Sequence, residues 1–372
     1  MSKLKVMTIL GTRPEIIRLS ECIKLFDKVF SHILVHTGQN YDYELYDVFF
    51  ENLNLRKPDY YLNCVGETLG QTIGNIIASS YDVIKKENPD AILILGDTNS
   101  ALSAISAKRL KVPIFHMEAG NRCFDENVPE EINRRILDHI SDINLPYTEN
   151  SRRYLLSEGI RKEHIFVTGS PMTEVLYKNF ENIEKSDILN RLNLKKGQYI
   201  VVSCHREENI DIKEHFHSLM NAIRDIDKIY NVPIVYSVHP RSMAQIKREG
   251  IKFSDNVIIS KPFGFFDYCK LQKESMVVLS DSGTLSEESA ILKFRGVLIR
   301  TSTERPEVID KGSIVIGGIK TKDIVQSINL ATSLPYPGTK PQDYEDINVS
   351  EKVARIIQSY TKIVNKFVWH KE

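Results

Sequence analysis

Short apolar runs rich in valine and isoleucine alternate with amphipathic stretches along the first half of the 372-residue chain. Runs of this kind are typical of strands buried on both faces, as in a parallel sheet covered by helices. We expect strands at residues 5–10, 32–37, 91–96, 112–117, 143–148 and 165–169. The stretch TLGQTIGNIIASSYDVIKKE is one of the helices between them. The first half therefore predicts an α/β domain.

The pattern restarts after a charged stretch, ENIEKSDILNRLNLKKG, that contains no long apolar run. The second series of expected strands covers residues 199–203, 233–239, 256–260, 276–280, 296–301 and 313–317. Together the two series predict an α/β protein of two Rossmann-like, doubly wound domains that meet near residues 169–171. The last helix, about residues 350–366, has an apolar face suited to pack on either domain.

The charge balance limits the partners of the chain. Lysine and arginine number 49, aspartate and glutamate also number 49, and the two signs are interspersed. This balance argues against non-specific binding to nucleic acid or to an anionic membrane surface. The five cysteines lack the spacing of a disulfide framework or a zinc site, and neither a secretory signal nor a run of 18 apolar residues occurs. We therefore expect a cytoplasmic protein.

Ligands of open α/β sheets bind outside the carboxyl ends of the strands, so the polar residues at those ends are candidates for the site. After the first expected strand comes GTRPEIIR, in which Gly11 permits a tight turn and Pro14 begins a helix. Its first N–H groups, with Arg13 and Arg18, favour a phosphate. A capped helix with surface arginines explains the same residues equally well.

Carboxylates follow two further strands. Asp97 stands at a strand end, where it either takes part in acid/base chemistry or caps the next helix. Glu118 ends a buried strand, and Glu130 and Glu131 lie in the first turn of a helix that starts at Pro129. A glutamate in the first turn of a helix usually just complements the helix dipole, and this explains Glu130 or Glu131 taken alone. It does not explain why both would lie in one cleft with Glu118.

The second domain offers a second anion site. His205 follows its first strand, and Ser282 and Gly283 open a helix whose backbone N–H groups form a cradle for phosphate. Glu288 is placed to accept hydrogen bonds from sugar hydroxyls or is simply an exposed helix charge, and Arg305 is a partner for phosphate or for Glu288. Two such sites favour one diphosphate, as in a nucleotide-sugar. No GxGxxG or Walker motif occurs after a strand, and no metal is required.

Seven motifs, in order, resemble those of the non-hydrolysing UDP-N-acetylglucosamine 2-epimerases: GTRPE, GDT, H-x-EAG-x-R, PEE-x-NR, HR-x-EN, DSG…EE and T-x-ERPE. The resemblance implies two domains arranged as in GT-B glycosyltransferases, facing a central cleft, with a C-terminal helix returning to the first domain. It places the first domain at residues 1–169, completed by about 357–372, and the UDP-binding domain at 170–356. It also implies a homodimer and no cofactor.

The chemistry implied by the resemblance is elimination of UDP across C1 and C2 of the sugar, followed by re-addition with a proton delivered to the opposite face. Asp97, Glu118 and Glu130 would surround the sugar, while His205 assists the diphosphate. Residues implied to bind UDP or substrate are Arg13, Arg18, Arg122, Ser282, Gly283, Glu288 and Arg305. Arg18 stands where the family usually has lysine.

The loop over residues 121–128 departs from the usual family pattern, since this chain reads EAGNRCFDENVPEE and, in the second domain, HREEN. This text resembles the branch that epimerises UDP-2-acetamido-2,6-dideoxy-L-talose to UDP-N-acetyl-L-fucosamine in capsule and O-antigen pathways. Three alternatives stay open: a UDP-N-acetylglucosamine 2-epimerase, a GT-B glycosyltransferase, and a non-catalytic UDP-sugar sensor.

Overall fold

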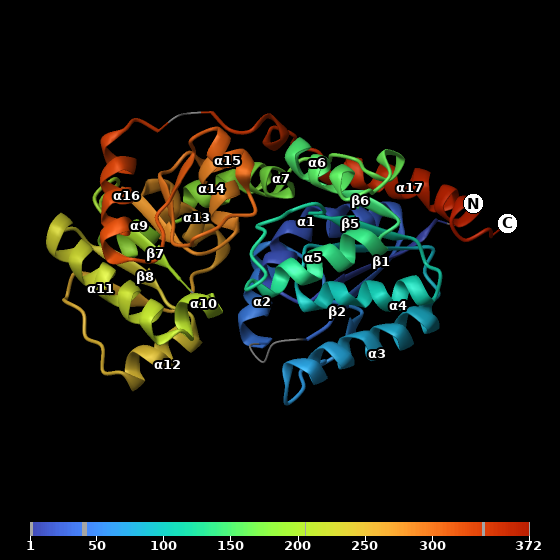
Figure 1. The fold of residues 1–372 in the computed structure, drawn as a ribbon, viewed down its shortest axis with the longest axis horizontal. Helices are drawn as coiled ribbons and strands as arrows, with labels where there is room; N and C mark the ends of the chain where they lie inside the picture. Colours follow the sequence, from blue (N-terminus) through green and yellow to red (C-terminus); the bar gives the residue numbers. More distant parts are fainter. Residues whose placement is uncertain (1–2, 39–42, 205, 337–338, 372) are drawn as a thin grey trace. The chain divides into compact units, whose positions relative to one another are not determined.

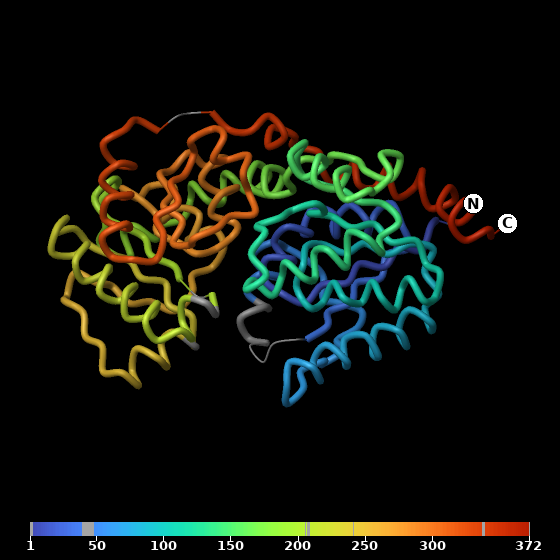
Figure 2. Tube along the Cα trace, in the orientation of Figure 1, coloured from blue at the N-terminus to red at the C-terminus, as the bar shows by residue number. Residues whose placement is uncertain are grey.

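The computed structural model describes residues 3–38, 43–204, 206–336 and 339–371. The chain divides into two compact units, the first made of Met1–Tyr177 and Asp343–Glu372 and the second of Lys178–Gln342. Each unit is a sheet with helices packed on it (Figure 1), and Figure 2 follows the chain through both. Among the described residues, no helix is long and apolar enough to cross a membrane.

Unit 1 is built on a six-stranded parallel sheet in the order β3-β2-β1-β4-β5-β6. Its strands are β1 Lys5–Leu10, β2 Ser31–His36, β3 Tyr60–Tyr61, β4 Ala91–Leu95, β5 Ile114–Met117 and β6 Ile143–Leu145. Its helices are α1 Arg13–Val29, α2 Tyr43–Asn52, α3 Leu69–Glu87, the 3₁₀ turn η1 Asn99–Leu102, α4 Ser103–Arg109, α5 Pro129–Ile140, α6 Glu149–Ser157, the turn η2 Lys162–His164, α7 Pro171–Lys178 and α17 Val349–Phe367. The inward residues of β1, β2, β4 and β5 form the buried core.

Unit 2 repeats this plan in a second six-stranded parallel sheet, in the order β12-β11-β10-β7-β8-β9. Its strands are β7 Ile200–Ser203, β8 Ile234–Ser237, β9 Val257–Ser260, β10 Val277–Ser280, β11 Gly296–Leu298 and β12 Ile314–Ile316. Its helices are α8 Phe180–Lys185, α9 Ile188–Arg191, α10 Glu207–Ile210, α11 Lys213–Tyr230, α12 Pro240–Arg248, α13 Phe265–Glu274, α14 Thr284–Leu292, α15 Pro306–Asp310 and α16 Thr321–Ser333. The turn η3 Gln342–Tyr344 crosses the boundary back into unit 1.

Both sheets have the same topology when their strands are numbered within each unit, with the order 3-2-1-4-5-6. The direction of winding reverses between β1 and β4 in unit 1 and between β7 and β10 in unit 2, and such switch points are where doubly wound sheets bind ligands. The predicted class, two Rossmann-like α/β domains, is confirmed. The expected strand at 165–169 is wrong, because only an isolated bridge between Asn144 and Ile165 forms there.

The C-terminal helix returns to unit 1, as the family resemblance implied. Helix α17, red in Figure 1, packs against α1 and buries Val353, Ile357 and Val364. The unit boundaries fall at 177/178 and 342/343, whereas the sequence placed them at 169/170 and 356/357. Helix α7 stays with unit 1 because Thr173 Oγ1 donates to the carbonyl of Tyr344 at 2.9 Å and Glu174 accepts a hydrogen bond from the Ser350 N–H at 2.7 Å.

Candidate active site

At the switch point of unit 1, the buried carboxylate of Glu15 in α1 connects the loops that follow β1 and β4. Its oxygens accept hydrogen bonds from the Gly11 N–H at 3.1 Å and the Thr12 hydroxyl at 2.7 Å, both at the end of β1. They also accept from the hydroxyls of Thr98 at 3.1 Å and Ser100 at 2.6 Å, which follow β4. Burial raises the pKa of Glu15, and these hydrogen bonds offset part of that rise. Glu15 therefore fixes the two loops that carry Arg13 and Asp97.

Arg13 is half-buried at the start of α1, and its guanidinium carbon lies 5.5 Å from the ring centroid of Phe49. A guanidinium over an aromatic face is held by a cation–π interaction, which keeps its charge near the helix N-terminus. This placement agrees with the predicted cationic character of the loop after β1.

Arg18 and Glu118, which the sequence assigned to separate roles, form a buried ion pair. Asn121 Nδ2 donates to the other oxygen of Glu118 at 3.3 Å. Glu118 adopts a left-handed backbone conformation with φ of 66°, which is uncommon for a residue with a side chain. Gly96, with φ of 71°, lies so close that a Cβ there would stand 3.4 Å from Glu118 Oε2. The Glu118 carboxylate is thus held at the ends of both β4 and β5.

The carboxylate of Asp97 is oriented by α5. Arg134 Nε donates to Asp97 Oδ2 at 2.5 Å, and Asn133 Nδ2 donates to the Asp97 carbonyl at 2.8 Å. The following turn, η1, has Thr98 at its N-cap. The capping role that the sequence left open for Asp97 is therefore wrong.

The two glutamates of the first turn of α5 lie in different environments. Glu130 is half-buried, whereas Glu131 is completely buried and accepts hydrogen bonds from the N–H groups of Cys123 at 3.1 Å and Phe124 at 3.3 Å. Burial alone would raise the pKa of Glu131, but these hydrogen bonds and the cationic Arg134 hold it below its usual value. Glu131 anchors the loop 121–128 instead of only complementing the helix dipole.

Asp138 of α5 connects the same loop to the sheet through a buried ion pair with His116. The carboxylate oxygen Oδ1 lies 3.0 Å from His116 Nδ1, and His116 Nε2 donates to the Gly96 carbonyl at 2.9 Å. Burial alone would lower the pKa of His116, but the Asp138 partner raises it overall, and the pKa of Asp138 is correspondingly lowered. His116 therefore fixes Gly96, the neighbour of Asp97.

Arg122 has its guanidinium completely buried between two carboxylates. Its Nη1 donates to Asp138 Oδ2 at 2.7 Å, and its Nε and Nη2 donate to Glu158 at 2.8 Å and 2.5 Å. These bonds engage all three nitrogens and hold the loop onto α5 and the end of α6. The geometry thus gives Arg122 a structural role, and its contact with substrate stays a prediction.

In unit 2, Asp281 joins the two strands of the switch point. This buried carboxylate, which follows β10, accepts hydrogen bonds from the Arg206 N–H and from Asn209 Nδ2, both at 3.0 Å. It thereby fixes the segment that follows β7. His205, which the sequence assigned to the diphosphate, lies outside the described residues.

The predicted phosphate cradle begins α14. Ser282 Oγ lies 3.0 Å from Thr284 Oγ1 and accepts from the Thr284 N–H at 3.3 Å. A Cβ on Gly283 would stand 2.5 Å from Glu304 Oε1, so the close approach of this carboxylate requires glycine. Arg300 Nη1 holds Glu304 at 2.8 Å. The cradle is therefore backed by a buried ion pair.

Glu288 and Arg305 are both buried in unit 2. Gln272 Nε2 donates to Glu288 Oε2 at 2.7 Å, which makes the alternative of an exposed helix charge wrong. Arg305 Nη2 donates to Glu287 Oε2 at 3.0 Å. Contact of Glu288 and Arg305 with UDP stays a prediction.

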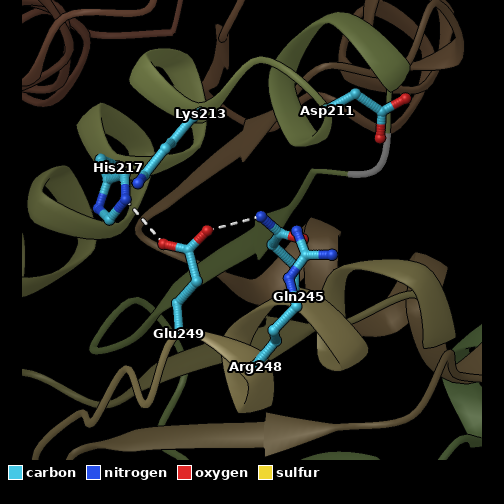
Figure 3. A pocket seen from close by; sticks show the side chains of 6 residues that line it. All are labelled: Asp211, Lys213, His217, Gln245, Arg248 and Glu249. Atoms are coloured by element: carbon cyan, nitrogen blue, oxygen red, sulfur yellow. Dashed lines mark hydrogen bonds and ion pairs between the residues drawn. The ribbon is translucent and has the colours of Figure 1, made fainter.

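A separate surface pocket of about 490 Å³ lies in unit 2 and is lined by side chains from the start of α11 and from α12 (Figure 3). Glu249 accepts from Gln245 Nε2 at 2.7 Å and lies 2.7 Å from His217 Nε2. Two cations, Lys213 and Arg248, and two carboxylates, Asp211 and Glu249, line the pocket.

Several residues that hold this site were not singled out in the sequence: Glu15, His116, Arg134, Asp138 and Asp281. Each lies within or beside one of the seven motifs given above, such as GTRPE, PEE-x-NR or DSG. Their charge and position were visible, but their partners lie on distant parts of the chain, so the sequence carried no signal that they orient other residues.

The fold and the site define a two-unit α/β enzyme with a GT-B-like architecture, and comparison with known proteins gives its family. Residues 25–358 match the family described as UDP-N-acetylglucosamine 2-epimerase. The chain belongs to this family, and it is an isomerase that acts as a UDP-sugar 2-epimerase.

Three similar proteins illustrate the family. The solved structure of UDP-N-acetylglucosamine 2-epimerase from Rickettsia bellii is 45% identical, with a TM-score of 0.91 over 99% of this chain and 100% of that one. The Methanocaldococcus jannaschii enzyme, solved in complex with UDP-GlcNAc and UDP, is 34% identical with a TM-score of 0.90, covering 95% and 99% of the two chains. The UDP-2,3-diacetamido-2,3-dideoxy-D-glucuronate 2-epimerase of Pseudomonas aeruginosa is 37% identical over 87% of this chain and 91% of its own length.

Proposed function

We propose that this epimerase converts UDP-2-acetamido-2,6-dideoxy-L-talose to UDP-N-acetyl-L-fucosamine for capsule or O-antigen polysaccharide. The observation that carries the proposal is the loop 121–128. Its sequence departs from the usual family pattern. It connects Glu118 to α5, the helix whose Arg134 donates a hydrogen bond to Asp97. A loop fixed between two candidate acid/base groups is suited to select the sugar.

The proposed reaction proceeds by elimination and re-addition. A base removes the proton from C2, the C1–O bond breaks, and UDP leaves with the electron pair to give a 2-acetamidoglycal. UDP oxygen then adds back to C1 while an acid delivers a proton to the opposite face of C2. We assign the proton transfers to Asp97, Glu118 and Glu130, with His205 assisting the diphosphate.

We assign UDP binding to the loop after β1, through Arg13 and Arg18, and to unit 2, through the Ser282–Gly283 cradle with Glu288 and Arg305. Backbone N–H groups at the start of α14 and nearby cations support this assignment. A homodimer and a cytoplasmic location remain part of the proposal, and light scattering of the purified protein tests the dimer.

Proton NMR of the purified protein in D₂O tests the substrate. Three compounds are compared without added nicotinamide: the L-talose derivative, UDP-N-acetylglucosamine, and UDP-2,3-diacetamido-2,3-dideoxy-D-glucuronate. Deuterium entering C2 of the L-talose derivative, with appearance of the L-fucosamine epimer, is the expected result. Exchange only in UDP-N-acetylglucosamine would overturn the proposal and assign the chain the UDP-N-acetylglucosamine 2-epimerase activity. Exchange only in the diacetamido sugar would assign the chain to that reaction.

Absence of exchange in all three compounds would favour the remaining alternatives, a GT-B glycosyltransferase or a UDP-sugar sensor. Calorimetry with UDP separates those outcomes from a misfolded sample, because either protein would still bind UDP.

A further inference from the structure

One guanidinium joins the candidate acid/base group Asp97 to the loop 121–128. Arg134 of α5 donates from Nε to Asp97 Oδ2 at 2.5 Å and from Nη1 to Glu131 Oε2 at 2.7 Å. The Arg134 side chain is only 4% exposed, and that of Glu131 is completely buried. Because both bonds are charge-assisted and shielded from water, they are stronger than surface contacts and fix the direction of the Asp97 carboxylate.

The other end of this connection is the loop itself. Glu131 accepts hydrogen bonds from the N–H groups of Cys123 and Phe124, at 3.1 Å and 3.3 Å. Phe124 has φ of 55°, a strained conformation for an aromatic residue, and its side chain is 63% exposed. Strain of this kind persists only where surrounding bonds impose it, so Glu131 sets the backbone course of the loop.

We propose that Arg134 is a positioning residue for Asp97, and that the Arg134–Glu131 pair couples the placement of loop 121–128 to the direction of the Asp97 carboxylate. A substitution that displaces loop 121–128 should therefore also misdirect the Asp97 carboxylate. The inference rests on the proposed assignment of Asp97 to proton transfer, but not on which UDP-sugar is the substrate.

A purely structural arginine and a positioning arginine give different kinetics. Loss of a structural residue lowers the folded fraction, and the remaining folded enzyme keeps its kcat. Misdirecting a proton-transfer group by about 1 Å lowers turnover on the order of a hundredfold with little effect on substrate binding. Lysine preserves the charge of arginine but lacks the planar fork that reaches two carboxylates at once. The lysine and glutamine variants at position 134 therefore separate charge from geometry.

The test compares Arg134→Lys, Arg134→Gln and the control Arg355→Gln, using the UDP-sugar that the wild type exchanges at C2. Arg355 of α17 is 71% exposed and pairs with the exposed Glu351. We expect kcat to fall about tenfold in Arg134→Lys and about a hundredfold in Arg134→Gln. The KM and the Kd for UDP should stay within about twofold of wild type, and Arg355→Gln should behave as wild type.

A normal kcat in folded Arg134→Lys and Arg134→Gln would overturn the inference, and so would a rise in KM with kcat unchanged. Glu131→Gln tests the coupling independently: combined with Arg134→Lys it should lower kcat by less than the product of the two single effects. Multiplicative effects would overturn the coupling. Failure of the wild type to exchange any UDP-sugar at C2 would overturn the proposed function first, and the inference with it.

Discussion

The guanidinium of Arg18, in the second turn of α1, donates a hydrogen bond to the carboxylate of Glu118 beyond the end of β5, and both side chains are only 8% exposed. One hundred residues separate the two partners in the sequence. The pair joins a cation predicted to bind the diphosphate to a carboxylate predicted to transfer a proton. The charge of Glu118 is therefore balanced within the protein.

Removal of the cation should destabilise unit 1. In Arg18→Ala the Glu118 charge stays buried without this partner, which should lower the free energy of unfolding by about 3 kcal/mol. Arg18→Lys keeps the charge and should lose less. Urea unfolding measures both, with Arg355→Ala as the control, because its exposed pair with Glu351 should contribute less than about 1 kcal/mol. Equal losses for Arg18→Ala and Arg355→Ala would contradict the importance of the buried pair.

Neutralising either candidate acid/base group should stop the chemistry while leaving UDP bound. We expect Glu118→Gln and Asp97→Asn to lower kcat by at least about a hundredfold, the usual contribution of a positioned acid or base. Calorimetry should give a Kd for UDP close to that of wild type. The control is Glu126→Gln, at a 75% exposed glutamate of the same loop. Near-normal turnover in both site variants would remove Glu118 and Asp97 from the proposed mechanism.

The His116–Asp138 pair should make stability depend on pH in a defined direction. The pKa of His116 is raised above its ordinary 6.5, so the stabilisation is fully present below pH 6.5 and is lost as pH rises through the folded-state value. The pKa of Asp138 is lowered below 3.8, so its contribution is lost only as pH falls below 3.8.

Urea unfolding of wild type and His116→Gln across this range measures the effect. The difference between the two proteins should be largest between about pH 4 and 6.5 and should shrink at alkaline pH. His139→Gln, at an exposed histidine of α5, is the control. A difference that grows as pH rises above 6.5 would show that His116 is neutral in the folded protein.

Gly283→Ala should impair the phosphate cradle. The new Cβ would stand 2.5 Å from Glu304 Oε1, so either this carboxylate must leave its contact with Arg300 or the backbone at the start of α14 must shift. We expect the Kd for UDP to rise about tenfold, measured by calorimetry, since displaced N–H groups lose their alignment with phosphate. Gly74→Ala in α3, where a Cβ meets nothing within 4 Å, should bind UDP as wild type does. An unchanged Kd in Gly283→Ala would place the diphosphate elsewhere.

Much of the fold could be predicted because buried parallel strands leave continuous apolar runs, and polar residues at their ends mark the switch points. The strand predicted at residues 165–169 does not form, because a short apolar run also suits an irregular segment packed against the sheet edge. The two-residue strand β3 was missed because Tyr60–Tyr61 is too short to produce a pattern.

Side-chain partners could not be predicted in the same way. Arg122 and Arg134 both stand in charged motifs, yet Arg122 is enclosed by Asp138 and Glu158 while Arg134 reaches Asp97. Which carboxylate an arginine meets depends on how α5 and α6 pack on the sheet. That packing brings together residues far apart in the chain, and hydrophobic periodicity contains no information about it.

The return of α17 to unit 1 also sets an order of events during synthesis. Unit 2 is one continuous stretch, Lys178–Gln342, whereas unit 1 needs Asp343–Glu372 as well as the first 177 residues. Because a ribosome delivers the chain from its N-terminus, the second unit has all its residues before the first one does. Until α17 emerges, the apolar surface of α1 that it covers is open to water or to a chaperone. The segment after unit 2 thus completes unit 1 only once unit 2 has been synthesised.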